Sequence, residues 1–340
     1  MSYIKGISYY LPEKVIANEQ LASEFPEWTV DKIADKIGIK NRHIAAECET
    51  ALDMAVAASE KLFDEYNIDK TTIDFILLCT QSPDYFLPAS ACIVQNKLNL
   101  PTNCGALDFN QGCSGFVYGL SLAKGLICAG IAKNVLLITS ETYSKYIHLK
   151  DKGNRTIFAD AAAATLVSTD ARTSRSTSGF AEIRNFSLGT DGKGANNLIV
   201  KSGALRQPIK TGMVIIDDAG NPISDDHLYM NGSEIFTFTL EAVPQLVEDT
   251  LIKNDMKKED INLFVFHQAN KYMMEFLRKK IKIDTSKFYY CLENFGNTVS
   301  STIPIALKEA SKDCSIKKGD KVLIAGFGVG YSWGGTVLVY

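Results

Sequence analysis

The sequence predicts an α/β protein made of two similar halves, and three observations support this. Short apolar runs of strand-forming residues alternate with amphipathic helical stretches along the 340 residues. The apolar runs lack a polar face, which is typical of sheets covered by helices on both sides. The two halves of the chain also show a weak internal similarity. In the first half, the apolar run ALDFN is followed by QGCSG and a helix, and in the second half the run LFVFH is followed by QAN and a helix. Cys113 and His267 occupy matching points of these two segments.

The pattern predicts strands and helices in alternation along the chain. The expected strands are Asp74–Thr80, Ala106–Asn110, Asn134–Ser140, Ala162–Ser168, Leu263–His267, Phe288–Leu292 and Lys321–Phe327. The expected helices are Thr50–Tyr66, Ser90–Leu98, Phe116–Gly130, Ser233–Asn254, Lys271–Lys280 and Thr302–Lys312.

A polar stretch near the midpoint, Thr169–Ser178, is the best candidate for an internal boundary. It divides the chain into an expected first half of residues 1–172 and a second half of residues 173–340. Residues Leu188–Leu228 are rich in Gly, Asn, Asp and Lys and have weak periodicity. A long excursion of this kind is often part of a substrate site or a lid.

Composition excludes several classes of protein. The net charge of -3 and the absence of a block of like charges give no sign of a nucleic-acid partner. No apolar run approaches the ~20 residues that span a bilayer, and the N-terminus lacks a signal-peptide pattern, so we expect a cytoplasmic protein. The eight cysteines have no metal-ligand spacing, so we expect reduced thiols and neither a metal nor a cofactor.

Cys113 is the first candidate for chemistry. It stands in DFNQGCSGFVYG, where an expected strand runs into a turn and then into a helix. Glycines on both sides permit a sharp turn that brings the backbone close to a ligand. At a helix N-terminus, free N–H groups and the helix dipole favour a thiolate, which is the nucleophilic form, and can also hold an oxyanion. A buried structural cysteine at a tight turn is the alternative.

His267 and Asn297 have weaker local signals. His267 ends a buried apolar strand, and functional side chains collect at the carboxyl ends of strands in α/β sheets. A single histidine there is more often an ordinary core residue. Asn297 lies in the turn FGNT before a helix, where asparagine is common for purely structural reasons.

The segment Gly326–Gly335 (GFGVGYSWGG) looks at first like a phosphate-binding loop. A dinucleotide site would need a helix after the glycines, but an expected strand, Thr336–Tyr340, follows them. We therefore expect these glycines to bring backbone close to a substrate, with an N–H available as an oxyanion donor.

Four segments in this order, QGCSGF, FHQAN, FGNT and GFGVGYSWG, resemble the β-ketoacyl-acyl carrier protein synthase III branch of the thiolase superfamily. The resemblance covers essentially the whole chain. It implies a thiolase-like fold, in which two pseudo-symmetric βαβ-type halves form five layers in the order αβαβα. A Cys-His-Asn set is similar to synthase III, whereas elongating ketosynthases carry Cys-His-His and thiolases Cys-His-Cys.

The resemblance also implies the reaction. Cys113 would take an acyl group from a thioester, with His267 assisting its activation, and malonyl-acyl carrier protein would then enter. His267 and Asn297 would stabilise the enolate formed as carbon dioxide leaves, and the backbone N–H groups of Cys113 and Val329 would hold the oxyanion of the attacked carbonyl. This is chemistry of fatty acid or related acyl-chain biosynthesis.

By the same resemblance, five side chains would contact the pantetheine-bearing substrates. They are Lys36, Lys152, Ser233, Gln268 and Asn270. Lysines at 36 and 152 replace arginines of the family pattern, so they keep charge but lose a flat stacking surface. The implied assembly is a homodimer, with Leu87 near the acyl pocket of the partner subunit and a cis peptide at Leu87-Pro88.

Acyl-coenzyme A, a malonyl thioester and acyl carrier protein are thus the expected substrates and partner. Two alternatives stay open. One is an acyltransferase of a specialised pathway that forms the same acyl-Cys113 without decarboxylation. The other is an inactive partner subunit or an acyl-binding module. The sequence leaves open the acyl chain length and whether coenzyme A or a carrier protein delivers the acyl group.

Overall fold

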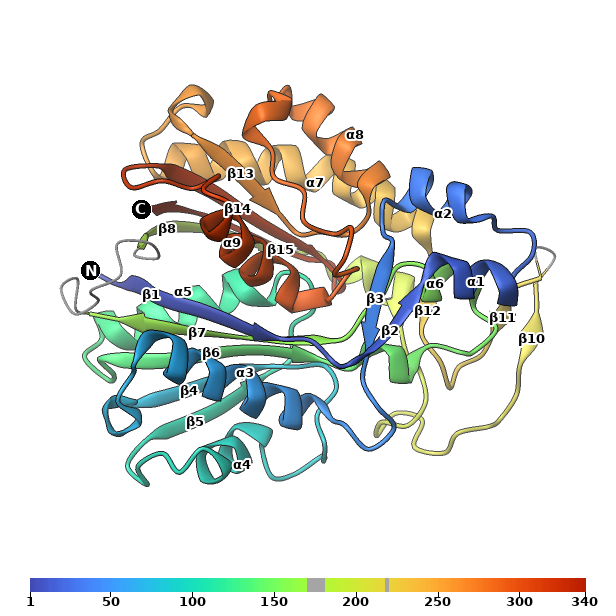
Figure 1. Cartoon of the computed structure of the whole chain (residues 1–340), viewed down its shortest axis with the longest axis horizontal. Coiled ribbons are helices and arrows are strands. Elements are labelled where there is room, and N and C mark those ends of the chain that lie inside the picture. Colours follow the sequence, from blue (N-terminus) through green and yellow to red (C-terminus); the bar gives the residue numbers. More distant parts are fainter. Residues whose placement is uncertain (170–180, 218–219) are drawn as a thin grey trace.

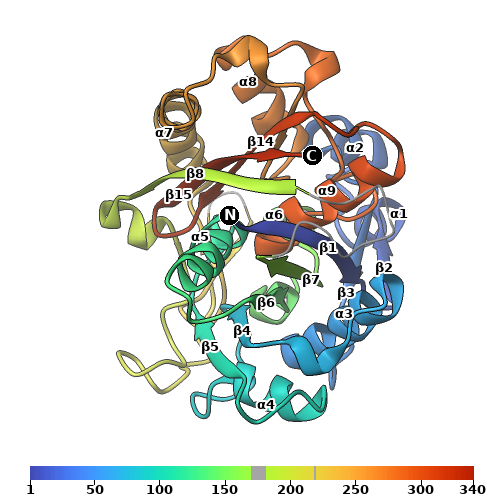
Figure 2. The ribbon, with the colours of Figure 1, turned by 90° about the vertical axis from the view of Figure 1, so that its left-hand side faces the viewer.

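The computed structural model describes residues 1–169, 181–217 and 220–340. Helices and strands alternate in five layers, which are seen edge-on in Figure 2. Nine strands hydrogen-bond in the order β13 (Leu263–Phe266), β14 (Lys321–Gly328), β15 (Ser332–Val339), β8 (Ala181–Thr190), β1 (Tyr3–Tyr10), β7 (Ala161–Ser168), β6 (Asn134–Glu141), β4 (Phe75–Cys79) and β5 (Gly105–Phe109).

The nine strands form two sheets that join along one short edge. β1 pairs with β7 over nearly its whole length, but it pairs with β8 only through Tyr3–Glu182 and Ile4–Ala181. Beyond this junction the two sheets separate, and helices α5 (Gly115–Cys128) and α9 (Thr302–Lys312) fill the space between them (Figure 2). The predicted five-layer α/β fold is confirmed.

The outer layers are also helical. Helices α3 (Ala51–Tyr66) and α4 (Ser90–Lys97) cover the free face of the sheet that contains β4 and β6 (Figure 1). Helices α7 (Gly232–Lys253) and α8 (Lys271–Ile281) cover the free face of the other sheet. Every central strand is therefore buried on both faces, which is why the strands read as continuous apolar runs.

Alternating side chains of each strand supply two different cores. In β13, Leu263 and Val265 pack in the central core with α5 and α9, while Phe264 and Phe266 pack in the outer core with α7 and α8. Helix α5 lies close against β6 because it has a glycine, Gly119, at the point of contact. A Cβ on Gly119 would lie 2.4 Å from Cδ1 of Leu137 in β6.

One predicted strand is wrong. Phe288–Leu292 forms only an isolated bridge between Phe288 and Phe264. The side chain of Gln268 takes the place of a strand partner, because its amide donates to the carbonyl of Tyr289 and accepts from the N–H of Cys291. The other predicted strands and the six helices are present, and most of their ends lie within two residues of the prediction. The exception is the last strand, expected at Thr336–Tyr340, which begins four residues earlier at Ser332.

The internal echo pairs segments that do not occupy equivalent layers. Helix α5 after Cys113 lies between the sheets, whereas α8 after His267 lies in an outer layer (Figure 2). The helix equivalent to α5 in the second half is α9, which follows Asn297. The predicted boundary between residues 172 and 173, and all but the first residue of the polar stretch that suggested it, lie outside the described residues.

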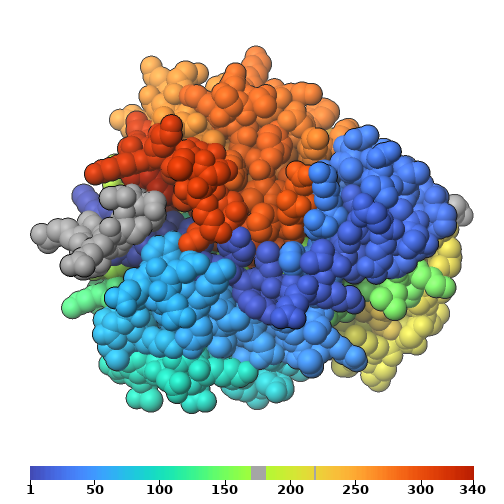
Figure 3. Space-filling model, in the orientation of Figure 1, coloured from blue at the N-terminus to red at the C-terminus, as the bar shows by residue number. Residues whose placement is uncertain are grey.

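Smaller elements gather at one end of the sheets. They are β2 (Lys14–Ala17), α1 (Asn18–Glu24), α2 (Val30–Ile37), β3 (Asn41–Ile44), α6 (Lys152–Arg155), β9 (Leu198–Ile199), β10 (Ile215–Ile216), β11 (Pro222–Ile223) and β12 (Tyr229–Met230). The N-terminal segment borders the second half of the chain in Figure 3, and the N–H groups of Lys40 and Asn41 donate to the carbonyl of Glu293. The excursion Leu188–Leu228 beyond β8 holds only two-residue strands and one short 3-10 helix among its described residues.

Candidate active site

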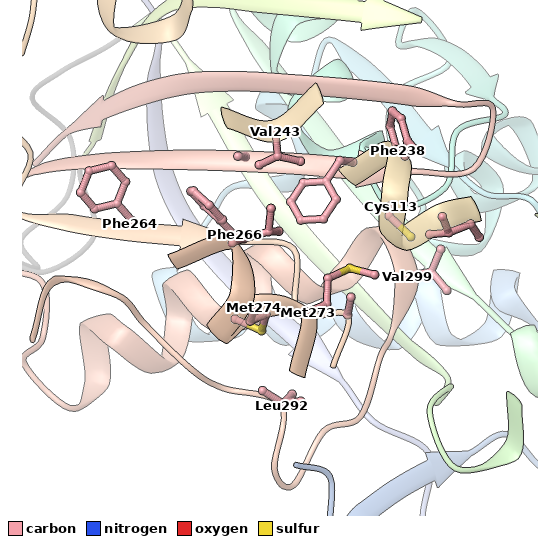
Figure 4. Close-up of a cluster of buried hydrophobic side chains, with 14 of the residues drawn as sticks. Cys113, Phe238, Val243, Phe264, Phe266, Met273, Met274, Leu292 and Val299 are labelled. Atoms are coloured by element: carbon pink, nitrogen blue, oxygen red, sulfur yellow. The ribbon is translucent and has the colours of Figure 1, made fainter. Parts of the chain in front are cut away.

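Cys113 lies in the loop that connects β5 to α5, directly before the first turn of the helix. The residue is 5% exposed, and its side chain belongs to the outer hydrophobic cluster drawn in Figure 4. Glycine is required around it. A Cβ on Gly112 would lie 2.3 Å from Cγ1 of Val329, and a Cβ on Gly328 would lie 3.0 Å from Sγ of Cys113.

The surroundings of Cys113 favour the neutral thiol. Burial and the nearby carboxyl of Glu141 raise the pKa of Cys113 to about 12, although the backbone N–H groups of Cys113 and Val329 act to lower it. A helix N-terminus favours the thiolate, as predicted from the sequence. At Cys113, however, the loss of solvation on burial outweighs the effect of the helix N-terminus. The same two N–H groups are the predicted oxyanion donors, and both lie within reach of Sγ.

Glu141, at the end of β6, is a fully buried carboxyl that the sequence analysis did not identify. Its oxygens accept the N–H of Gln81 at 3.0 and 3.1 Å and the hydroxyl of Ser82 at 3.0 Å. Burial raises the pKa of Glu141 to about 8 in spite of these donors. The only available signal was an acidic residue that closes the otherwise uncharged strand NVLLITSE.

His267 follows β13 and is 2% exposed. Its backbone N–H donates to the carbonyl of Ala325 in β14 at 2.8 Å, and its Nδ1 lies 2.7 Å from the hydroxyl oxygen of Thr302. Burial lowers the pKa of His267 to about 3. The imidazole is therefore neutral throughout the physiological pH range.

Asn297 is held so that one donor remains available. Its backbone N–H donates to the carbonyl of Ile157, its carbonyl accepts the N–H of Ala159, and its Oδ1 accepts the N–H of Val299 at 2.9 Å. Reversing the amide would set Nδ2 against the N–H of Val299, two donors face to face. The Nδ2 group is thus the one polar group of Asn297 that these contacts leave for a substrate.

Strand β14 brings the candidates together. Its Ala325 carbonyl holds the backbone of His267, while Gly326 and Gly328 lie against Cys113. A Cβ on Gly326 would meet the carbonyl oxygen of Cys113 at 2.8 Å. On the other side, the turn before α9 holds Asn297, and Thr302 at the start of α9 contacts His267. Figure 4 shows Val299 of this turn beside Cys113.

The expected glycine loop Gly326–Gly335 is mostly strand. β14 continues to Gly328 and β15 begins at Ser332, so a tight hairpin at Val329–Tyr331 replaces the loop. The hydroxyl of Ser332 lies 2.7 Å from that of Ser114, which joins the hairpin to the start of α5. This contact holds the N–H of Val329 against Cys113.

The predicted substrate-binding residues lie at the end of the molecule formed by α1, α2 and α6. Lys36 is exposed in the last turn of α2, and Ser233 is exposed at the start of α7, with its hydroxyl donating to Asn231. Lys152 is mostly buried and forms an ion pair with Glu27 at 2.9 Å. A substrate phosphate at Lys152 would have to share this lysine with Glu27 or displace it.

The side chains of the other two predicted substrate-binding residues already form hydrogen bonds within the protein. Gln268 is 2% exposed, and its amide is bonded to backbone groups on both sides of Tyr290, as described above. Asn270 caps α8, since its Oδ1 accepts the N–H of Met273 at 2.9 Å. Their predicted contacts with substrate stay predictions.

Leu87 lines a cavity of about 1050 Å³ that Val329 also lines. The leucine is 82% exposed, and its peptide bond to Pro88 is cis, as expected. Val329 and Gln81, which both approach Gly112, line the same cavity. Gln81 is a second residue that the sequence analysis missed. The cavity therefore reaches from Val329 and Gln81, beside Gly112, to the exposed loop of Leu87.

Two general features complete the description. No helix among residues 1–169, 181–217 and 220–340 is long and apolar enough to cross a bilayer. Within the same ranges, no three His, Cys, Asp or Glu side chains gather in a way that could hold a metal ion.

Comparison with known proteins identifies the family of the chain. Residues 107–192 match the family 3-oxoacyl-[acyl-carrier-protein] synthase III, and residues 251–340 match its C-terminal domain. The chain is 36% identical to a β-ketoacyl-[acyl-carrier-protein] synthase III of Clostridium perfringens over 98% of this chain and 97% of that protein.

Solved structures give the same result. A crystal structure of a 3-oxoacyl-(acyl-carrier-protein) synthase III is 46% identical, with a TM-score of 0.95 over 100% of this chain and 99% of that one. The priming β-ketosynthase of the R1128 polyketide pathway is 25% identical, with a TM-score of 0.86 over 100% of this chain and 96% of that one. The matched segments contain Cys113, His267 and Asn297, and from them we conclude that the chain belongs to the 3-oxoacyl-[acyl-carrier-protein] synthase III family.

Proposed function

We propose that the protein condenses an acyl group carried on Cys113 with a malonyl thioester of acyl carrier protein. As a member of its family, the chain is a condensing enzyme of the β-ketoacyl synthase III type in fatty acid biosynthesis. The observation that carries the residue assignment is the position of the Cys113 thiol, at the start of α5 and within reach of the N–H groups of Cys113 and Val329.

In the first half-reaction, Sγ of Cys113 attacks the carbonyl carbon of an acyl thioester. The oxyanion that develops would accept hydrogen bonds from the N–H groups of Cys113 and Val329, which are fixed in place before the substrate arrives. The carbon–sulfur bond of the donor then breaks, the acyl group stays on Sγ, and the thiol proton ends on the departing thiol. The resemblance gives His267 the role of assisting this activation.

In the second half-reaction, the malonyl thioester loses carbon dioxide. The electrons of the broken bond form an enolate, whose oxygen would accept hydrogen bonds from His267 and from Nδ2 of Asn297. A neutral imidazole and an amide suit this position because neither adds a fixed charge to the buried site. The enolate carbon attacks the acyl carbonyl, the bond from the acyl carbon to sulfur breaks, and Cys113 leaves as a thiolate that takes a proton from solvent.

Two further assignments belong to this proposal. Exposed Leu87 beside the cavity supports a homodimer in which the partner subunit covers the acyl pocket. The ion pair between Lys152 and Glu27 favours a donor other than free coenzyme A, because the lysine is already neutralised. A carrier protein as the acyl donor, and a cytoplasmic location, are also part of the proposal.

Mass spectrometry tests the acyl-enzyme directly. The protein is incubated with acyl groups of several lengths on coenzyme A and on acyl carrier protein, and Cys113 is examined for the added mass. Release of carbon dioxide from malonyl-acyl carrier protein is measured in parallel. Acylation without decarboxylation would favour the non-decarboxylating acyltransferase, and unmodified Cys113 with every thioester would favour an inactive subunit.

A further inference from the structure

The cavity that Leu87 and Val329 line has a polar part as well as an apolar part. Apolar side chains come from the loop of Leu87 and from the excursion Leu188–Leu228. Four of the polar side chains form one hydrogen-bonded group, which we call the Gln81 cluster: Gln81, Asn110, Tyr143 and Tyr146. If only a plain hydrocarbon chain bound here, it would displace water from this cluster without replacing the water's hydrogen bonds, which is unfavourable.

Gln81 lies at the centre of the cluster and is held on all sides. The phenolic oxygen of Tyr143 lies 2.5 Å from its Oε1, and its Nε2 lies 2.8 Å from Oδ1 of Asn110. Its backbone N–H donates to the carboxyl of Glu141, and its carbonyl accepts the hydroxyl of Tyr146 at 2.7 Å. The amide of Gln81 is therefore fixed in the cavity wall before an acyl group enters.

This amide also lies beside the loop of the nucleophile. A Cβ on Gly112, the residue before Cys113, would lie 2.8 Å from Oε1 of Gln81 and 2.3 Å from Cγ1 of Val329. Because Val329 supplies one of the proposed oxyanion donors, the amide is close to the place that the carbonyl of the acyl group would take. The first carbon atoms beyond that carbonyl would then pass Gln81.

One N–H of Gln81 has no partner among the described residues, and this holds for either orientation of the amides. With Oε1 toward Tyr143, one N–H of Nε2 donates to Asn110 and the second is free. With both amides reversed, Nε2 donates one N–H to Tyr143, Oε1 accepts from Asn110, and again one N–H is free. Burial and the nearby carboxyl of Glu141 raise the pKa of Tyr143 well above its usual value, so the phenol keeps its hydrogen.

We propose that the acyl group accepted by Cys113 carries a keto or hydroxyl oxygen on its third carbon, counted from the thioester carbonyl, and that Gln81 selects this acyl group through its free N–H. The inference rests on the proposed function and names its substrate class. A cavity of about 1050 Å³ has room for an acyl group larger than acetyl. A plain alkyl chain of the same length would cover the N–H without pairing it, and we expect it to react about ten- to hundredfold more slowly.

Competition between acyl groups of equal length tests the proposal. The native enzyme is incubated with equal amounts of butyryl, 3-hydroxybutyryl and 3-oxobutyryl thioesters, on coenzyme A and on acyl carrier protein, and the masses added to Cys113 are compared. We expect at least one oxygenated group to acylate Cys113 about ten- to hundredfold faster than butyryl, and the two oxygenated arms distinguish a keto from a hydroxyl group. Butyryl that reacted as fast as both would overturn the proposal.

Variants test whether Gln81 makes the selection. Gln81→Met keeps a side chain of similar length but has no N–H, so the oxygenated and plain groups should react within about threefold of each other. Gln245→Met is the matched control, because Gln245 is exposed on α7 and its side chain bonds to Asp249; the native preference should persist in it.

A native preference that survived in Gln81→Met would also overturn the proposal. Failure of the proposed function has a different signature, because Cys113 would then gain no mass from any of the thioesters.

Discussion

Gly328 is the glycine whose replacement should most directly disturb the nucleophile. A Cβ added there would lie 2.9 Å from Cβ of Cys113 and 3.0 Å from its Sγ. Ordinary contacts between such atoms begin near about 3.5 Å, so roughly 0.5 Å must be gained by movement. Cys113 cannot retreat easily, because Gly326 of the same strand already lies against its carbonyl.

Gly328→Ala should therefore misplace Sγ relative to the N–H groups that would hold the oxyanion. A displacement of this order slows a positioned reaction by about ten- to hundredfold, and overpacking lowers the free energy of unfolding by about 1–3 kcal/mol. The assay is the rate of Cys113 acylation, followed by mass spectrometry, together with urea unfolding of the same sample.

Gly125→Ala is the matched control, because Gly125 lies in α5, the helix that follows Cys113, and its added Cβ would meet nothing within 4 Å. It should raise the free energy of unfolding by about 0.5–1 kcal/mol and leave acylation unchanged. If Gly328→Ala acylated as fast as the native enzyme, the crowding around Cys113 would not position the thiol, and the reasoning would be refuted.

Three other changes test the rest of the site. Asn297→Asp replaces the Nδ2 donor by a carboxylate oxygen. It should slow decarboxylation, measured as carbon dioxide release, by at least about a hundredfold, while acylation of Cys113 persists. An equal loss of decarboxylation and acylation would contradict the role of Nδ2. Burial lowers the pKa of His267 from 6.5 in the unfolded chain to about 3 in the folded protein. As the pH falls below 6.5, His267 takes up a proton in the unfolded chain but not in the folded protein, so the free energy of unfolding decreases. His267→Gln should therefore lose less free energy of unfolding than the native enzyme between pH 7 and pH 5 in urea titrations, and parallel curves would contradict the buried neutral ring. Leu87→Asp should dissociate a dimer in sedimentation. Ile252→Asp should not, because Ile252 is also exposed but lies on α7. Dimers in both variants would argue against an interface at Leu87.

Several features of the site were predictable from local sequence. The glycines around Cys113, the strand that ends at His267 and the turn at Asn297 are contiguous patterns, and their order along the chain matches one family. Contacts that a side chain makes with residues distant in sequence were not predictable in this way. Gln268 replaces a strand partner for residues 289–291, and that substitution is invisible in the apolar pattern that predicted a strand there.

Glu141 and Thr302 were missed for a related reason. Each belongs to an ordinary segment, an apolar strand and the start of an amphipathic helix, and gains its role only from neighbours that are distant in sequence. The charge of Glu141 raises the pKa of Cys113, and burial of both groups raises the pKa of each. Thr302 matters because the turn before α9 lies against the end of β13.

By itself, the sequence determined the alternation of buried strands and helices, the glycine-flanked thiol and the order of the catalytic segments, because these depend on periodicity and on neighbours a few residues apart. Only the tertiary structure decided which helices lie between the sheets, the protonation of the Cys113 thiol and the partner of Nδ1 of His267. Those properties arise from burial and from hydrogen bonds between residues distant in sequence, such as Thr139 and Ser301, which are 162 positions apart, and Ser114 and Ser332, which are 218 apart. Such contacts exist only after the two sheets have closed around α5 and α9.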